Sequence, residues 1–389
     1  MELVHKYIED NIDKALQDLG ILCSFQSVAV KGKYMAETAE YVKHLLDSAG
    51  FNTKLLFVDG ANPVVFGELK GQSDRTLLFY NHYDVQPADE PGWLSDPFKV
   101  IEKDGYVYGR GVSDNKGNII ARILAVKAYK DVFGTLPITI KFFIEGDEEI
   151  GSPKIKDIIE RYHELLTADA IIWEGGSKDH EGYPRIYYGT KGTCYLELEA
   201  TCTGKVLHSS MASVIPNPAV DLVRALASMQ KDTGEIAIKG FYDDLYEPGK
   251  EEILAAEALS EIGNDFKENY KINKFARNIA PEKVSYDLFF TPFFVINGIN
   301  SGYTGTGMKQ IMPDKATAKI EFMLIPAQDA EDILRKVKKH LEDNGYSNIK
   351  TNKLGALNPQ LTPMSHPFVK LTQNVAKEVY EVDPVLYPT

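Results

Sequence analysis

The sequence is poor in cysteine and has no long apolar segment. Its 389 residues include three cysteines, Cys23, Cys194 and Cys202, which are too few and too scattered for a disulfide framework or a cysteine-ligated zinc site. No apolar run approaches the roughly 20 residues of a membrane helix. The N-terminus also lacks the basic and then apolar pattern of a signal peptide. These absences predict a cytoplasmic protein with reduced thiols and no membrane partner.

Basic residues are in the minority. Acidic residues outnumber lysine and arginine by 56 to 43, which gives a formal net charge of -13. This balance argues against nucleic acid as a partner and leaves small substrates open. Hydrophobic residues at 44% and charged residues at 25% are ordinary for a globular protein. Because 389 residues are many for one hydrophobic core, we expect two domains.

Three short apolar runs each stop at a side chain that can bind metal. Runs rich in β-branched and aromatic residues are typical of buried strands, and in open α/β sheets ligands bind beyond the carboxyl ends of the strands. The runs are 76–80 before His82 and Asp84, 138–144 before Glu148 and Glu149, and 170–173 before Glu174. We therefore expect an imidazole and several carboxylates in one crevice, joined by Asp114 from a glycine-containing loop.

Imidazole and carboxylates together suit zinc, with cobalt or manganese as alternatives. The expected ligands are His82, Asp114, Glu149 and Glu174. One ion would leave ligands over, so we expect two divalent ions that share a bridging carboxylate, for which Asp114 is the candidate. Any one of these acids alone is more often a turn former or a solvated charge. The prediction rests on their arrival at the ends of neighbouring strands.

Two further acids are expected to act beside the metal ligands. Glu148 adjoins Glu149 where the chain leaves a strand, and neighbouring side chains there point in different directions. Glu148 is therefore the candidate general base, which takes a proton from water and returns it to the leaving amine. Asp84 is expected to hold the imidazole of His82 through its other ring nitrogen. A plain turn acid is the alternative for Asp84.

The order of the predicted elements indicates an α/β domain followed by an α+β domain. Helices at 2–20, 36–48 and 116–132 alternate with strands, which favours a mixed or parallel sheet with helices on both faces. The second domain reads as strand 193–200, a helix 218–229 opened by Asn217-Pro218, strand 318–324, helix 330–344 and strand 348–353. An acidic insertion holds a helix near 251–262, and a last helix covers 367–380. We assign 1–186 and 358–389 to the catalytic domain and 187–357 to the second domain.

Three segments resemble the signatures of a known enzyme family. The segments are 81–87 (NHYDVQP), 109–117 (GRGVSDNKG) and 145–152 (EGDEEIGS). They are similar to the di-zinc aminoacylase and carnosine-dipeptidase family of metallopeptidases, which includes glutamate carboxypeptidase and succinyl-diaminopimelate desuccinylase. The resemblance covers nearly the whole chain. It implies a zinc-peptidase-like three-layer catalytic domain with a mixed sheet, plus an inserted ferredoxin-like α+β lid domain that forms a homodimer.

The resemblance also implies roles for individual residues. By similarity, His82 and Glu174 hold one ion, Glu149 holds the other and Asp114 holds both, and the peptide bond between Asp114 and Asn115 is cis. The segment 204–210 resembles the family's lid motif, whose histidine, here His208, reaches the active site of the partner subunit and steadies the oxyanion. A solvent-facing loop histidine is the alternative for His208.

Two departures from the family pattern bear on these expectations. The family's second ion takes a final histidine after a Gly-Gly-Ser loop, and the sequence ends at Thr389 before either. We therefore expect an incomplete C-terminal part that binds one ion poorly, with His366 the only histidine in that tail. In addition, Met323 stands where a lid strand of the family carries an arginine that grips the substrate's carboxylate. Lys191 or Lys309 is the candidate replacement for that charge.

The sequence favours one function and leaves three alternatives. We predict a metallopeptidase that hydrolyses the amide bond of dipeptides or short peptides by a metal-bound hydroxide. N-acyl amino acids are the closest alternative substrates. A metal- or peptide-binding protein without catalysis is the rival from another class, because the final histidine ligand is missing. A purely structural dimer of lid domains is the third alternative.

Overall fold

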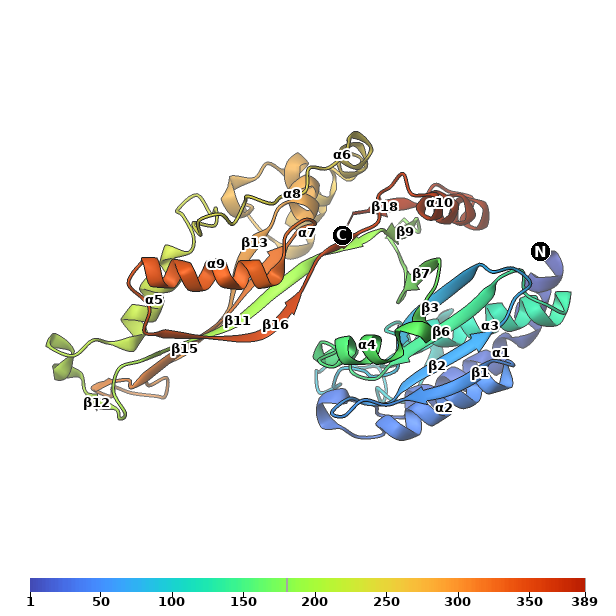
Figure 1. Ribbon diagram of the computed structural model, residues 1–389, viewed down its shortest axis with the longest axis horizontal. Helices are drawn as coiled ribbons and strands as arrows, with labels where there is room; N and C mark the ends of the chain where they lie inside the picture. Colours follow the sequence, from blue (N-terminus) through green and yellow to red (C-terminus); the bar gives the residue numbers. More distant parts are fainter. Residues whose placement is uncertain (180, 389) are drawn as a thin grey trace. The chain divides into compact units, whose positions relative to one another are not determined.

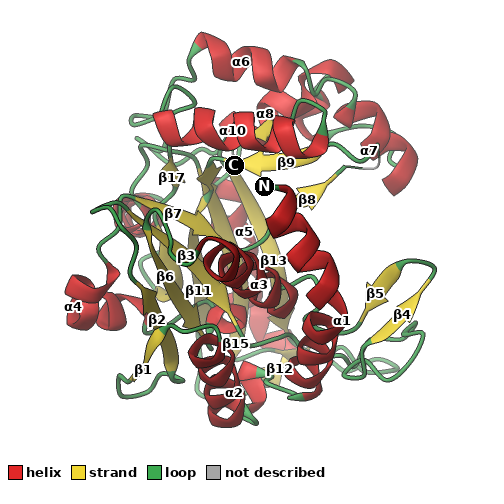
Figure 2. Cartoon of the chain, turned by 90° about the vertical axis from the view of Figure 1, so that its right-hand side faces the viewer, coloured by secondary structure: helices red, strands yellow, loops and turns green. Residues whose placement is uncertain are grey.

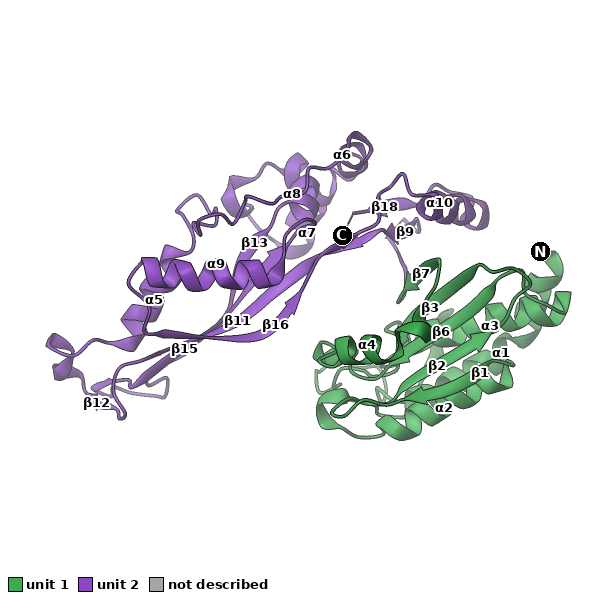
Figure 3. Cartoon of the chain, in the orientation of Figure 1, with its two compact units in different colours: residues 1–175 green, residues 176–389 purple. Residues whose placement is uncertain are grey.

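The computed structural model describes residues 1–179 and 181–388 and divides the chain into two compact units (Figure 3). Unit 1 comprises Met1–Gly175, and unit 2 comprises Gly176–Thr389. Residue 389, the last of the second segment assigned to the catalytic domain, lies outside the described residues. Among the described residues, no helix combines the length and apolar character that crossing a membrane requires.

Unit 1 is built around a mixed five-stranded sheet (Figure 1). Its helices are α1 (Glu2–Ser24), α2 (Met35–Ser48), α3 (Lys116–Phe133) and α4 (Ile155–Leu166), and its sheet strands are β1 (Asn52–Leu56), β2 (Val64–Leu69), β3 (Thr76–His82), β6 (Thr139–Glu145) and β7 (Ala170–Trp173). The strand order is β1-β2-β6-β3-β7. Strand β3 runs parallel to β6 and β7, whereas β2 is antiparallel to both β1 and β6. The predicted mixed sheet is therefore confirmed.

Helices cover both faces of this sheet, which explains why its central strand, β6, is mostly apolar, with Lys141 as the exception in its middle. Every residue of β6 is buried. Alternate side chains such as Phe142 and Ile144 pack with α1, α2 and α3, and Phe143 packs with Ile158 of α4 on the opposite face. Successive side chains of a strand point to opposite faces of the sheet. A strand that is covered by helices on both faces therefore needs apolar side chains on both. In Figure 1, α4 lies across the sheet from the other three helices.

The loop between β3 and α3 carries a small hairpin and ends at a buried lysine. The hairpin consists of β4 (Ile101–Lys103) and β5 (Tyr106–Tyr108) and extends away from the sheet (Figure 2). Lys116, the first residue of α3, is fully buried. Its ammonium donates hydrogen bonds to the carbonyls of Leu22 and Phe25, at 3.0 and 2.8 Å, at the end of α1. The start of α3 is thereby tied to α1.

Unit 2 contains a four-stranded antiparallel sheet with two helices packed on one face. The strands are β11 (Gly192–Thr201), β13 (Phe293–Ser301), β15 (Lys315–Leu324) and β16 (Ile349–Leu357), in the order β13-β15-β11-β16, and the helices are α5 (Pro218–Ser228) and α9 (Ala330–Asp343). Buried and half-buried residues alternate along β11. The buried set, which includes Leu196 and Leu198, packs with Leu222 of α5 and Val337 of α9. Because helices cover only one face of this sheet, only the side chains on that face need to be apolar.

The rest of unit 2 consists of short strands and further helices. The strands are β8 (Ser177–Lys178), β9 (Pro184–Tyr187), β10 (Gly189–Thr190), β12 (Leu207–His208), β14 (Ile311–Met312), β17 (Gln360–Leu361) and β18 (Val385–Tyr387), and the helices are α6 (Lys250–Glu257), α7 (Ile262–Tyr270), α8 (Val284–Phe290) and α10 (Pro367–Tyr380). Strand β18 pairs in parallel with β9. Tyr387 of β18 packs against Phe289 and Phe290 of α8.

Most predicted elements appear at the predicted positions. The carboxamide oxygen of Asn217 accepts a hydrogen bond from the Ala219 amide at 2.9 Å, and Pro218 opens α5 as expected. The single helix predicted around 251–262 is wrong at its end, because α6 stops at Glu257 and α7 begins at Ile262. Strands β1 and β13 and helix α4 were not predicted. The apolar residues of β1 and β13 are mixed with polar ones and give a weak periodic signal, whereas those of α4 recur at helical spacing and offered a signal for a helix.

Candidate metal centre

The carboxyl ends of three parallel strands meet at one edge of the unit 1 sheet. Strand register places His82 of β3 opposite Glu145 of β6 and Tyr80 opposite Trp173 of β7. The residues at the end of each strand, or just after it, therefore lie side by side at this edge. These are His82 itself, the short turn η2 (Glu148–Ile150) after β6, and Glu174 after β7.

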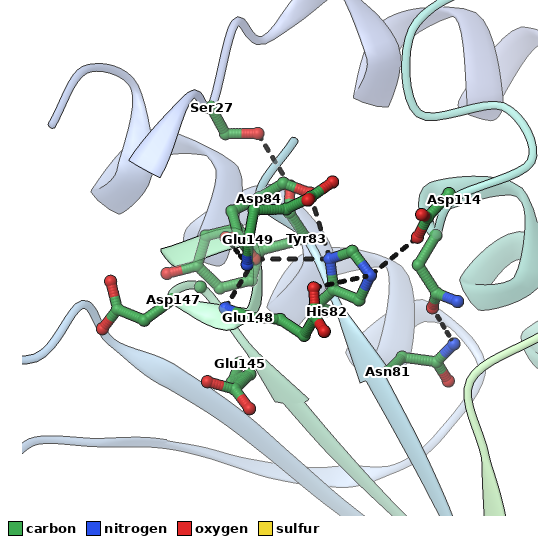
Figure 4. Close-up of polar contacts among 12 residues, drawn as sticks. Ser27, Asn81, His82, Tyr83, Asp84, Asp114, Glu145, Asp147, Glu148 and Glu149 are labelled. Atoms are coloured by element: carbon green, nitrogen blue, oxygen red, sulfur yellow. Dashed lines mark hydrogen bonds and ion pairs between the residues drawn. The ribbon is translucent and has the colours of Figure 1, made fainter. Parts of the chain in front are cut away.

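Five potential ligand groups converge on this edge. One set of ligand atoms comes from His82, Glu148 and Glu174, a second comes from His82, Asp114 and Glu149, and within each set the atoms lie within 4.8 Å of one another. Nε2 of the buried His82 is 2.8 Å from a carboxylate oxygen of Asp114 and 3.8 Å from one of Glu148 (Figure 4). The peptide bond between Asp114 and Asn115 is cis, as the resemblance implies.

Asp84 connects the imidazole to the turn that carries Glu148 and Glu149. It is fully buried. Its carboxylate accepts hydrogen bonds from the amides of Glu148 (3.3 Å) and Glu149 (2.9 Å). Nδ1 of His82 lies 3.1 Å from the Asp84 carbonyl oxygen and 3.3 Å from its carboxylate. These contacts assign a proton to Nδ1, since both neighbours are acceptors. Nε2 faces the Asp114 carboxylate, to which it can donate when the ring is charged, and it can bind a cation when the ring is neutral.

The acids around His82 shift its pKa and their own. Burial disfavours the imidazolium, but the hydrogen bonds to Asp114 and Asp84 outweigh it and raise the pKa of His82. Burial raises the pKa of Glu148 to about 7, with His82 opposing and Glu174 and Glu149 adding to the rise. Burial likewise raises the pKa of Glu174. The contributions of Asp114 and Asp84 to the His82 shift, and of Glu174 and Glu149 to the Glu148 shift, show that the edge concentrates negative charge.

The donor set fits a divalent cation. No lysine or arginine among residues 1–179 and 181–388 forms an ion pair with Asp114, Glu148, Glu149 or Glu174. The four carboxylates outnumber the single positive charge that His82 can carry, so they repel one another. An imidazole nitrogen and carboxylate oxygens are the ligands that zinc and similar ions take in proteins. A cation between them would neutralise the repulsion.

The predicted residues of unit 2 have their own partners. His208 is exposed on β12, where Nδ1 contacts the Ser210 hydroxyl at 2.9 Å and Nε2 contacts the Gln310 side-chain oxygen at 3.1 Å. The Lys191 ammonium donates to the Leu288 carbonyl, and the Lys309 ammonium lies 5.3 Å from the ring centre of Tyr303.

His366 and Met323 also lie in ordinary structural settings. Nδ1 of His366 accepts a hydrogen bond from the Phe368 amide at 3.2 Å and caps α10. Among the residues that the structure describes, His366 joins none of the potential metal-ligand groups. Met323 is half-buried on β15, on the face away from α5 and α9, between Thr193 and Phe293 of the neighbouring strands.

Sequence reasoning missed several residues that support this edge. Glu145 is buried and accepts hydrogen bonds from the hydroxyls of Tyr80 (2.5 Å) and Ser152 (2.9 Å). Arg122 of α3 donates to backbone carbonyls at the ends of β3 and β7. The available signal for Arg122 was a charged residue among the buried Ile119, Ile120 and Ile123 on one helix.

A family comparison decides the identity. The model for Peptidase family M20/M25/M40 matches residues 78–389. The chain belongs to this peptidase family. The resemblance read from the three motifs is therefore confirmed, and the protein is a metal-dependent peptidase that cleaves amide bonds.

Relatives of the M20/M25/M40 chain include dipeptidases and a carboxypeptidase. It is 30% identical to human Beta-Ala-His dipeptidase over an alignment of 390 positions, which covers 95% of this chain and 76% of the relative. It is 29% identical to the Cys-Gly metallodipeptidase of Schizosaccharomyces pombe over 83% of this chain and 70% of the relative. The crystal structure of an M20 family metallo-carboxypeptidase from Sulfolobus solfataricus matches with a TM-score of 0.91 and 35% identity, covering 96% of this chain and 85% of that one.

Proposed function

We propose that the protein hydrolyses the peptide bond of dipeptides or short peptides. The observation that carries this proposal is the convergence of His82 with carboxylates from three separate loops at one sheet edge. The names of the human and Schizosaccharomyces pombe relatives support dipeptides as the substrate class. N-acyl amino acids are less favoured as substrates, because these relatives are named for dipeptides.

We propose that the edge holds two divalent ions, with zinc as the native metal. His82 and Glu174 would hold one ion, Glu149 would hold the other and Asp114 would contact both. One ligand group contains His82 with Glu174 and the second contains Asp114 with Glu149, whereas the bridging role of Asp114 rests on the family resemblance. When bound, such ions polarise a carbonyl group and lower the pKa of water. Asp84 would keep the His82 ring in the orientation that directs Nε2 at the ion.

Glu148 is the proposed general base and acid. Its carboxylate belongs to the same short turn as Glu149, lies 3.8 Å from Nε2 of His82, and keeps about a third of its side chain exposed at 34%. It is therefore close to the expected ion and open to substrate. Glu148 would accept a proton from the attacking water and then protonate the amine that leaves.

The lid is proposed to be residues 187–357 of unit 2. The order β11-α5-β13-β15-α9-β16 in one antiparallel sheet supports a ferredoxin-like lid over residues 187–357, with 1–186 and 358–389 as the catalytic part. We propose that the lid forms a homodimer and that His208 donates a hydrogen bond to the oxyanion in the partner's site. The exposure of His208 supports this role. A cytoplasmic location is supported by three free cysteines.

Hydrolysis of a dipeptide panel tests the proposal. The full chain is stripped of metal, loaded with zinc, cobalt or manganese, and assayed against dipeptides and the matching N-acyl amino acids. We expect metal-dependent release of amino acids from dipeptides and slower turnover of the acylated compounds. Protein that binds metal stoichiometrically and cleaves no dipeptide would instead support the non-catalytic rival.

A further inference from the structure

Arg122 of α3 joins the two strands that carry His82 and Glu174. Its guanidinium donates hydrogen bonds to the Tyr80 carbonyl at 2.8 Å and to the Asn81 side-chain oxygen at 2.7 Å, and it also donates to the Glu174 carbonyl. Tyr80 and Asn81 immediately precede His82 on β3. One side chain therefore contacts the backbone next to one candidate ligand and the backbone of another.

The same network reaches the loop that carries Asp114. Asn81 is fully buried, and its side-chain amide donates a hydrogen bond to the Asn115 side-chain oxygen. Asn115 is also buried and directly follows Asp114. Figure 4 shows Asn81 pointing to this loop, on the far side of the strand end from Glu145. Three ligand-bearing segments are thus connected through Arg122 and Asn81.

The backbone of Glu174 needs such support. Its φ angle is +42°, in the left-handed region that residues other than glycine seldom occupy. Its amide donates to the Tyr80 carbonyl at 3.0 Å, and its carbonyl accepts from Arg122. An unfavourable backbone conformation persists only where surrounding contacts determine it. Arg122 and the Tyr80 carbonyl each hold one of the Glu174 peptide groups.

Arg122 itself is held by the core of unit 1. The guanidinium carbon lies 5.0 Å from the ring centre of Phe79, a cation–π distance. Phe79 and Asn81 project from the same face of β3, toward α3, because side chains two residues apart share a face. The planar fork can donate to several acceptors at fixed angles, which a lysine cannot do. The three acceptors around Arg122 therefore use the several fixed donors of a guanidinium.

We propose that Arg122 is a positioning residue that sets the spacing between the metal ligands His82, Glu174 and Asp114. This inference rests on the proposed metal centre. Residues behind the ligands fix ligand orientation, and their loss typically weakens metal binding by about 10- to 100-fold. Arg122 does so from α3, through the backbone rather than through the ligand side chains.

A matched control exists at the opposite ends of the same two strands. Arg75 precedes β3 and its guanidinium pairs with Asp169, which precedes β7, at 3.0 Å. The Asp169 carboxylate also accepts from the Thr76 amide at 2.8 Å. Arg75 thus joins β3 to β7 as Arg122 does, but away from the candidate ligands.

The test measures metal affinity of the full chain by competition with a chelator, together with the visible spectrum of the cobalt-loaded protein. We expect Arg122→Met to bind zinc and cobalt about 10- to 100-fold more weakly and to alter the cobalt spectrum. Arg122→Lys should fall between it and the parent, because an ammonium can still donate to a carbonyl. Arg75→Met should bind as the parent does.

Equal affinity and an unchanged cobalt spectrum in Arg122→Met would overturn the proposal, as would an equal loss in Arg75→Met. If Arg122→Met does not fold, Arg122→Lys decides by the same criteria. The readout requires no substrate. A parent protein that binds metal and hydrolyses no dipeptide would overturn the proposed function and leave this test in force.

Discussion

The two ends of strands β3 and β7 in unit 1 are each linked by an arginine, but in opposite surroundings. At the amino ends, Arg75 meets Asp169 at the surface, with 76% of the Arg75 side chain exposed. At the carboxyl ends, Arg122 is half-buried and donates to neutral carbonyl and amide oxygens. An exposed ion pair contributes about 0 to 1 kcal/mol. A half-buried cation is costly unless its donors are used, and the three acceptors of Arg122 all lie beside candidate metal ligands.

Buried polar groups follow the same division. His82, Asp84, Glu145 and Asp147 are all buried near the carboxyl end of the sheet. The rest of the sheet is filled mainly by apolar residues such as Ile140 and Phe142, with Thr139 and Lys141 as buried exceptions on β6. The apolar part of the sheet therefore stabilises the fold, whereas the buried polar groups at its carboxyl edge lower the free energy of unfolding. Four predictions test this division, in order of decreasing effect.

The largest effect is expected at Glu148. Glu148→Gln keeps the size of the side chain and removes its ability to accept a proton. Because general base catalysis typically contributes about 10²- to 10⁴-fold, kcat should fall by about that factor while metal content stays unchanged. Glu9→Gln, at an exposed acid of α1, serves as the control. Activity close to that of the parent in metal-loaded Glu148→Gln would refute the role.

Metal removal should destabilise the carboxyl edge of unit 1. A ligand present at 100 times its Kd stabilises the folded state by about 2.7 kcal/mol. Urea titration with and without chelator should show a loss of this size in the free energy of unfolding. The same loss is expected in Arg75→Met, whereas His82→Ala should show little response to the chelator. An unchanged unfolding midpoint in chelated parent protein would count against the metal centre.

A smaller effect is expected where Gly175 meets α3. A Cβ at Gly175 would lie 2.6 Å from the side-chain nitrogen of Asn118, which donates to the Ser113 carbonyl at 2.8 Å. Gly175→Ala should displace Asn118 and lose that hydrogen bond, lowering the free energy of unfolding by about 0.5 to 1.5 kcal/mol. Gly176→Ala is the control, because its Cβ would approach no atom closer than 3.9 Å. Equal stability of the two variants would contradict the steric argument.

The smallest effect is expected at the amino edge. Arg75→Met removes an exposed ion pair and should lower the free energy of unfolding by about 0 to 1 kcal/mol. The difference from the parent should shrink as salt concentration rises, because salt screens exposed charges. Urea titrations at low and high salt measure both quantities. A loss above about 2 kcal/mol would show that the two ends of the strands are not as different as their surroundings indicate.

The sequence predicted the sheet of unit 1 and the group of side chains at its carboxyl edge. Both follow from a local pattern, since β3 and β7 are short and mostly apolar, His82 ends β3 and Glu174 directly follows β7. The family assignment also followed from motifs. The three-dimensional proximity of Asp114 was expected from its motif rather than from periodicity.

Other features had no local signal. The acceptors of Arg122 are two backbone carbonyls and one amide oxygen, and backbone groups are the same in every sequence. A single arginine on α3 could equally have faced solvent. The roles of His208 and Met323 remain predictions, because they concern how a substrate and a second subunit meet the site.

The pairing of β3 with β6 limits how this enzyme can change in evolution. His82 lies opposite Glu145 in a parallel register, and Asn81, one residue earlier, faces α3. Deleting one residue within β3 would exchange these two orientations, because side chains alternate in a strand. The imidazole would then turn toward the helix, away from the acids. The hairpin of β4 and β5 carries no candidate ligand and can gain or lose residues without this consequence, but β3 cannot.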